Sequence, residues 1–157
     1  MNAQASESTT LCSRYEKCCT AFVPLGPLMA RLALGIVFFA HGSQKMFGCF
    51  GGHGWSGTVG FMHDKLGIPV AFAALAIIAE FLGALGVLVG LATRLAAFGI
   101  FCVMAVAVFF VHLPNGFFAE KHGFEYPMAL GLVALSLVFS GPGPWSLDEI
   151  IKRRRKR

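Results

Sequence analysis

Ionisable side chains inside long apolar segments are the residues of this chain best placed to do chemistry. At ~1.5 Å per helical residue, Arg31 lies roughly 10 Å from the start of the first apolar segment, and Glu80 roughly 16 Å from the end of the second. An extended arginine can bridge the ~6 Å difference in height, so we expect Arg31 and Glu80 to form an intramembrane ion pair. A structural pair is favoured over a proton or quinone site, because an isolated pair without a third titratable group relays protons poorly.

A second group of polar side chains should gather near the opposite face of the membrane. His41 lies roughly 25 Å into the first segment, and Lys45 follows about one turn later. His112 comes about eighteen residues, a whole number of turns, after Arg94, which gives it nearly the height of His41. The fourth segment begins at the same level. We therefore expect one outer-leaflet pocket lined by His41, Lys45, His112, Glu125 and Tyr126.

Several interpretations of this pocket stay open. Histidines that only satisfy hydrogen bonds near an interface are the commonest case. A quinone head group needs one or two donors beside an apolar slot, which the pocket and neighbouring phenylalanines could supply. A bis-histidine haem needs both imidazoles facing one cavity, and it ranks lowest. No spacing indicates a metal site, and we expect the cysteines to be unpaired thiols: Cys12, Cys18, Cys19, Cys49 and Cys102.

Four apolar segments must position these residues. They cover residues 24–47, 68–91, 94–113 and 124–140, each near the ~20 residues that a helix needs to cross a bilayer. The composition agrees, with 56% hydrophobic residues, 13% charged residues and a mean hydropathy of +0.69. Backbone groups in lipid must pair within the chain, which favours helices over strands. The sequence predicts an all-α polytopic membrane protein with a four-transmembrane-helix bundle.

The domain organisation follows from these segments. Residues 1–20 are polar and lack apolar periodicity, so we expect a disordered cytoplasmic tail. Residues 24–141 form the transmembrane domain, and residues 142–157 form a basic cytoplasmic tail. In the first connection, residues 48–57 are too rich in glycine for a regular element, whereas residues 58–66 could form a short amphipathic helix. After the fourth segment, the run from Ser146 to Glu149 resembles the cap of a short cytoplasmic helix.

The basic residues are divided unequally between the two sides of the membrane. Ten of them lie on one side: Arg14 and Lys17 before the first helix, Arg31 near its start, Arg94 in the second connection, and the six residues of the C-terminal run 152–157. Three (Lys45, Lys65 and Lys121) lie on the other side. The positive-inside rule places both termini in the cytoplasm. The net charge of +5 is thus a feature of topology and anionic lipid contact, and nucleic-acid binding is not expected.

Small residues repeat along the second apolar segment. Ala79, Gly83, Gly86 and Gly90 allow close backbone approach, which is how helices associate in lipid. We interpret them first as intrachain packing positions and second as an oligomerisation surface.

Six short motifs, in order, resemble the DoxX family over roughly residues 28–147. They include histidine, lysine, glutamate and arginine residues discussed above. The motifs are Arg31-Leu32 leading to His41-Gly42-x-x-Lys45; Gly67-Ile68-Pro69 leading to Glu80-Phe81-Leu82-Gly83; Gly90-Leu91-Ala92-Thr93-Arg94; His112-Leu113-Pro114-Asn115-Gly116-Phe117-Phe118; Gly123-Phe124-Glu125-Tyr126-Pro127; and Gly141-Pro142-Gly143-x-x-Ser146-Leu147-Asp148.

The resemblance implies a multi-pass four-helix bundle in a bacterial inner membrane. Some members of this family are named as subunits of thiosulfate:quinone oxidoreductases. We therefore expect an accessory or quinone-interacting subunit of a membrane redox system, with a membrane or periplasmic redox partner protein. The main alternative is a non-catalytic scaffold or assembly factor that binds partner proteins. A small-molecule transporter ranks third, because one such unit would have to form a homo-oligomer to enclose a pathway.

Overall fold

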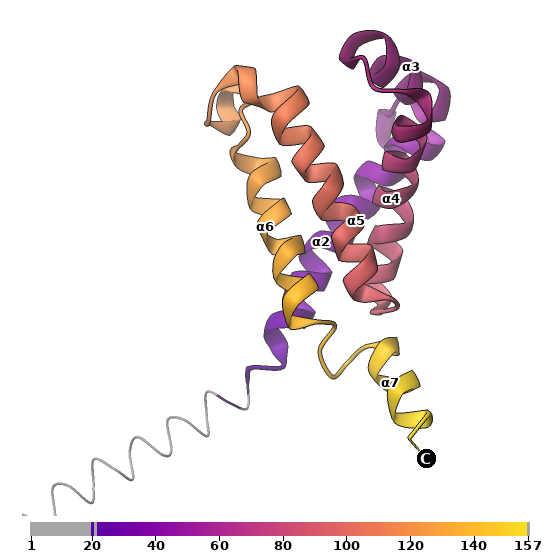
Figure 1. Ribbon diagram of the computed structural model, residues 1–157, viewed down its shortest axis with the longest axis vertical. Helices are drawn as coiled ribbons and strands as arrows, with labels where there is room; N and C mark the ends of the chain where they lie inside the picture. The colour runs from indigo at the N-terminus through magenta and orange to yellow at the C-terminus, as the bar shows by residue number, and fades with distance from the viewer. Residues whose placement is uncertain (1–19, 21, 157) are drawn as a thin grey trace, which may run out of the picture.

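The protein is a bundle of helices with a short helix at each end (Figure 1). The computed structural model describes residues 20 and 22–156, and within this range there is no strand, which confirms the all-α prediction. The long helices are α2 (Leu25–Phe47), α4 (Val70–Val89), α5 (Thr93–Val106) and α6 (Glu125–Ser140). The short elements are η1 (Cys49–Gly51), α3 (Gly54–Leu66), the π-helical turn η2 (Ala107–His112), η3 (Leu113–Asn115), η4 (Ala119–Lys121) and α7 (Leu147–Arg154).

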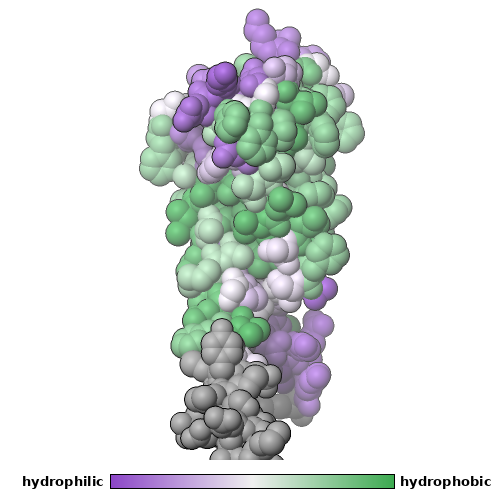
Figure 2. Space-filling model, turned by 90° about the vertical axis from the view of Figure 1, so that its left-hand side faces the viewer, coloured by the Kyte–Doolittle hydropathy of each residue, from purple (hydrophilic) through white to green (hydrophobic). Residues whose placement is uncertain are grey.

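Three helical stretches are long and apolar enough to cross a membrane: Leu25–Phe47, Val70–Val89 and Thr93–Asn115. The fourth apolar helix, α6, has 16 residues, or about 24 Å, which is less than the ~30 Å hydrocarbon core. On the face shown in Figure 2, an apolar belt crosses the middle of the molecule, with hydrophilic side chains gathered beyond it toward both ends. The lipid bilayer is therefore its environment, whereas four complete spans and cytoplasmic termini remain predictions.

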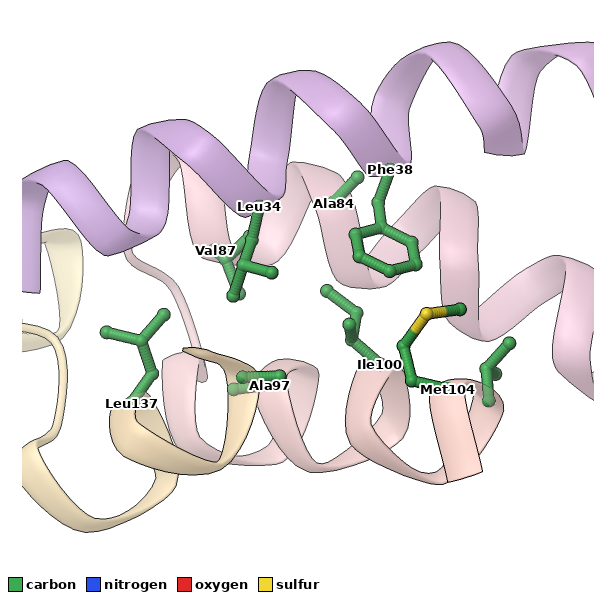
Figure 3. Close-up of a cluster of buried hydrophobic side chains, with 10 residues drawn as sticks. Leu34, Phe38, Ala84, Val87, Ala97, Ile100, Met104 and Leu137 are labelled. Carbon is green, nitrogen blue, oxygen red and sulfur yellow. The ribbon is translucent and has the colours of Figure 1, made fainter. Parts of the chain in front are cut away.

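The core forms where α2 and α4 face α5 and α6. Leu34 and Phe38 of α2 point toward Ile100 and the neighbouring residues of α5, and Leu137 of α6 completes the cluster (Figure 3). Gly42 brings α2 against the backbone of α4, since an added Cβ would lie 2.8 Å from the Phe81 Cα. In lipid, close contacts of this kind are the main source of helix association.

The small residues of α4 pack within the chain, as the sequence predicts. A Cβ added at Gly86 would lie 2.9 Å from the Cβ of Ala96, and one at Gly83 would lie 3.1 Å from Ile100. Both neighbours belong to α5, so these glycines set the close α4–α5 contact.

Two local predictions have different outcomes. The expected short helix over residues 58–66 is confirmed as part of α3, but α3 begins at Gly54. The prediction that residues 48–57 hold no regular element was therefore wrong for residues 54–57, which are helical, and residues 49–51 form the single 3-10 turn η1. Helical backbone pairing there outweighs the conformational cost of the glycines. The expected tail at residues 1–20, with Cys12, Cys18 and Cys19, lies outside the described residues except for Thr20.

Arg31 joins three parts of the fold through backbone carbonyl oxygens. Its Nε donates to Val87 O at 2.7 Å and its Nη2 to Leu88 O at 2.8 Å, in the last turn of α4. Its Nη1 donates to Pro142 O at 3.1 Å and to Trp145 O at 2.7 Å, in the segment after α6. Carbonyls at a helix C-terminus lack partners within the helix, and a cation there is also favoured by the helix dipole. The 2% exposed Arg31 thus stabilises α2, α4 and the α6–α7 connection together.

The expected Arg31–Glu80 ion pair is not formed. Arg31 lies level with the last turn of α4, whereas Glu80 lies about two turns deeper along the same helix. The prediction measured depth from the ends of two apolar segments as if they began at one height. Because α2 extends past the end of α4, those two ends lie at different heights.

Asp148 holds the turn between α4 and α5 from a distant part of the chain. Its carboxylate accepts hydrogen bonds from Ala92 N at 2.8 Å and Thr93 N at 2.9 Å, and its own N–H donates to Gly90 O at 2.9 Å. Burial raises the Asp148 pKa, but the two backbone hydrogen bonds and the Arg31 charge outweigh it and hold the pKa below the ordinary value. The predicted cap of α7 is confirmed beside it, because Ser146 Oγ accepts from Glu149 N.

Replacing Arg31 should destabilise the fold far more than replacing another arginine on a helix. Arg31→Met removes the donors of four carbonyl oxygens, and unpaired buried acceptors each cost about 1–3 kcal/mol. We expect a loss of at least about 3 kcal/mol, measured by thermal unfolding in detergent. Arg94→Met is the matched control, since Arg94 donates one 3.4 Å hydrogen bond to Phe139 O. Equal midpoints for the two variants would contradict this role.

Asp148→Asn should destabilise the protein in a pH-dependent way. The amide keeps one acceptor oxygen, so we expect a loss of about 1–2 kcal/mol near neutral pH. A carboxyl group whose pKa is lowered by folding stabilises the folded protein at pH values above its ordinary pKa of ~3.9. This contribution disappears as the pH falls through the lowered pKa of the folded protein. The gap in thermal midpoint between wild type and variant should therefore narrow below about pH 4. The control is Asp64→Asn, at an exposed carboxylate of α3, and it should show no such gap.

Candidate functional site

A cavity of about 900 Å³ lies between α2, α3, α4 and the second half of the α5–η2 helix. The cavity lies toward the end of the bundle opposite α7, where α5 diverges from α4 in the upper half of Figure 1. The volume is within the range of small-molecule sites in proteins, about 300–1,000 Å³. This is the candidate functional site of the described chain.

The walls of the cavity are mostly apolar, and part of them faces outward. Phe72 and Leu75 of α4, Phe98 of α5 and Phe110 of η2 line the cavity, and each is at least half exposed. Side chains exposed along the apolar belt meet lipid chains in a bilayer, so the cavity opens sideways between α4 and α5. A ligand that enters from the hydrocarbon phase fits this arrangement.

An ion pair lies in the wall of the cavity. Lys45 Nζ, on the last turn of α2, contacts Glu80 Oε1 in the middle of α4. The close approach of Gly42 to Phe81 sets this register, because Lys45 is one turn beyond Gly42 and Glu80 is adjacent to Phe81. Glu80 is 1% exposed, whereas the Lys45 side chain is 30% exposed. A charge buried to this degree requires a partner, and Lys45 supplies it.

One oxygen of this carboxylate is left without a partner. Among residues 20 and 22–156, no donor lies within hydrogen-bond distance of the buried Glu80 Oε2. Buried polar atoms are nearly always hydrogen-bonded, so an unpartnered one in a cavity wall indicates a position where a ligand or water donates. Lys45 in turn has further N–H donors beside the one directed at Glu80.

His112 adds a titratable ring where the helix becomes irregular. It ends the π-helical turn η2, a kind of distortion frequent at functional sites, and it lines the cavity. Its Nδ1 lies 2.6 Å from His122 O, and a carbonyl oxygen only accepts, so Nδ1 carries the proton. In the neutral ring Nε2 is then an acceptor.

The structure brings together only part of the predicted outer-leaflet pocket. Lys45 and His112 line the cavity, whereas His41, Glu125 and Tyr126 do not. His41, one turn before Lys45 on α2, is exposed and does not line the cavity. The rings of His41 and His112 therefore do not face one cavity. A bis-histidine haem would require that they do.

Glu125 and Tyr126 belong to a different part of this end of the molecule. Glu125 Oε2 accepts from Ala119 N at 2.9 Å and so fixes the connection between η4 and α6. Tyr126 is half exposed on α6. Height along the helix axis placed these residues correctly near one end, but it carried no information on which face of the bundle they occupy.

Sequence reasoning missed several polar residues of the cavity wall. Glu80 was assigned to the wrong partner, His53 was given no role, and Gln44 and Thr58 were not considered; all four line the cavity. The signal available for Glu80 was Gly42, since a glycine on a helix marks a close contact that fixes the register of its neighbours. His53 lies in the glycine-rich part of the connection, which has no periodic signal. Thr58 begins the predicted amphipathic helix, but its sequence does not tell how that helix lies against the bundle.

Apolar helices, an apolar belt and a cavity open to that belt define an integral membrane protein. The chain belongs to the DoxX family, whose model matches residues 26–113. The resemblance stated from the motifs is thus confirmed.

Curated relatives agree with this assignment. An uncharacterized membrane protein of Mycobacterium tuberculosis, Rv3486, is 31% identical over 83% of this chain and 84% of its own length. The Bacillus subtilis protein named "Putative oxidoreductase CatD" is 28% identical over 84% of this chain and 91% of its own length. The inner membrane protein YqjF of Escherichia coli is 27% identical over 83% and 95%, respectively. No solved structure matches this chain.

The two members of the cavity ion pair should show unequal and coupled effects on stability. Lys45→Met leaves the buried Glu80 charge without a partner, so we expect a loss of about 3–5 kcal/mol. Glu80→Leu should cost less, because the partly exposed Lys45 can reach water. The double variant Lys45→Met/Glu80→Leu should recover much of the loss in thermal unfolding. Additive effects of the two changes would contradict the pairing.

Proposed function

We propose that this protein is an accessory subunit of a redox system in a bacterial inner membrane, and that its cavity binds the head group of a lipid quinone. The observation that carries the proposal is the unpartnered buried Glu80 Oε2 beside Lys45, in an apolar cavity that opens toward the lipid. The ion pair then has a binding role as well as a structural one.

The polar groups of the cavity match both forms of such a ligand. The carbonyl oxygens of a quinone accept hydrogen bonds, which the Lys45 ammonium group can donate. The hydroxyl groups of the reduced quinol donate, and Glu80 Oε2 and the His112 Nε2 can accept from them. The outward-facing phenylalanines Phe72 and Phe98 provide an apolar path for the isoprenoid tail.

The comparisons support the setting of this proposal. CatD is named an oxidoreductase, and YqjF is named an inner membrane protein. The uneven distribution of basic residues supports cytoplasmic termini, which would direct the cavity end toward the outer side of the membrane. Four crossings of the bilayer, with α6 as the shortest, complete this topology. The electron donor would then be a membrane or periplasmic partner protein.

Quinone content of the purified protein tests the proposal. Protein extracted in a mild detergent should carry quinone, measured in its organic extract by chromatography with ultraviolet detection. His112→Leu removes the imidazole acceptor in the cavity, and the loss of one hydrogen bond, about 1–1.5 kcal/mol, should lower the bound quinone roughly five- to tenfold. His41→Leu is the matched control, because His41 is exposed outside the cavity, and it should retain the wild-type amount.

Other outcomes would contradict the proposal. Wild-type protein with only phospholipid in its extract would assign the cavity to ordinary lipid. Extract without quinone, together with a stably co-purified protein, would instead favour the scaffold or assembly-factor alternative. An equal loss of quinone in His41→Leu and His112→Leu, with both variants folded, would exclude His112 as a specific contact.

A further inference from the structure

The helix α7, at the end of the bundle opposite the cavity, carries both basic and apolar side chains at its surface. Its last turn contains Lys152, Arg153 and Arg154, and Arg155 and Lys156 follow directly. Ile150 and Ile151 are 48% and 40% exposed on the same short helix. A helix of this composition favours the boundary between headgroups and acyl chains.

This helix is fixed to the end of the membrane bundle. Arg31 holds the Trp145 carbonyl just before α7, and Ser146 caps its first turn. Asp148 binds the turn between α4 and α5 through its carboxylate and its N–H group. The basic side chains of α7 therefore stand in a defined place relative to the apolar belt.

A hollow of about 500 Å³ lies between α7 and the α4–α5 turn. Its basic lining residues are Lys152, Arg155 and Lys156, and its apolar ones include Leu91 and Ile151. Leu91 is 45% exposed, and Leu95, one turn into α5, is 73% exposed, so an apolar surface continues from the hollow into the belt.

Among the described residues, two of the three basic side chains of this hollow have no carboxylate partner. Its carboxylate, Asp148, is already engaged by two backbone N–H groups of the turn. The Glu149 carboxylate pairs with two other basic groups, since its Oε1 lies 3.2 Å from Arg153 Nε and its Oε2 lies 3.8 Å from Lys152 Nζ. In the described part of the chain, no carboxylate lies within 4 Å of Arg155 or Lys156. The hollow therefore presents positive charge at the level of the headgroups.

We propose that this hollow is a binding site for an anionic phospholipid. The Arg155 guanidinium and the ammonium groups of Lys152 and Lys156 contact the phosphate, and the acyl chains lie along Leu91 and Leu95. Arginine binds phosphate oxygens in a bidentate way, and basic pockets beside membrane helices recognise lipid phosphates. Charge complementarity and the adjoining apolar surface together favour a lipid over a soluble anion.

Two double variants with the same change in charge test this site. Arg155→Gln/Lys156→Gln removes two side chains that line the hollow, whereas Arg153→Gln/Arg154→Gln removes two basic side chains of α7 that do not. Delipidated full-length protein in a non-ionic detergent is titrated with phosphatidylglycerol or phosphatidylcholine, and bound lipid is counted by native mass spectrometry. Thermal unfolding without added lipid checks that both variants are folded.

The wild type should bind phosphatidylglycerol in preference to phosphatidylcholine. The Arg155→Gln/Lys156→Gln variant should weaken phosphatidylglycerol binding at least about tenfold, because it loses two cations that face the lipid phosphate. The Arg153→Gln/Arg154→Gln variant should change the binding little. Equal weakening in both pairs would show a diffuse attraction to a basic tail and overturn the site. So would equal binding of both lipids by the wild type, or displacement of the lipid by millimolar inorganic phosphate.

Discussion

Arg31 is the residue on which the arrangement of this bundle depends. A guanidinium group has five donors in a fixed plane, and here four backbone carbonyls from two separate segments accept from it. These carbonyls lie at a helix end and in a connection, where the backbone cannot satisfy itself. Within a low-dielectric environment this requirement is strict, so the cation that satisfies it also decides how α2, α4 and the α6–α7 segment meet.

At the other end of the molecule, the requirement that buried polar groups have hydrogen-bond partners is met only in part. Glu80 is as deeply buried as Arg31, yet it has one partner, Lys45, and one free oxygen. At the Arg31 end every donor contact is made to backbone, which suits a purely structural junction. At the Glu80 end a polar group remains available in the wall of an apolar cavity, which suits recognition of a ligand. The Arg31 junction is thus wholly engaged in holding the helices together, whereas the Glu80 carboxylate stabilises its neighbour Lys45 and keeps one oxygen unpartnered.

Close contacts at two glycines allow both the Lys45–Glu80 ion pair and the Arg31 junction to form. Gly42 fixes the crossing of α2 and α4, and it thereby aligns Lys45 with Glu80. At Gly90, with φ of 72°, an added Cβ would lie 2.5 Å from the Ser146 Cβ and 2.7 Å from an Arg31 nitrogen, so only glycine lets the α4–α5 turn approach this junction. Asp148 then ties that turn to α7, and through it the basic C-terminal segment is held beside the membrane.

The sequence by itself determined the helical class, the positions of the long helices to within a few residues, the intrachain role of the small residues of α4, and the presence of Arg31 and Glu80 inside apolar segments. These properties depend on local composition and on the length that a bilayer demands. Only the tertiary structure decided which partner each buried charge has and which polar residues share a cavity. The physical reason is that depth counted along one helix carries no information about the offset between helices or the direction each face points. Both are set by contacts such as Gly42–Phe81 and Arg31–Val87, which join residues far apart in the chain.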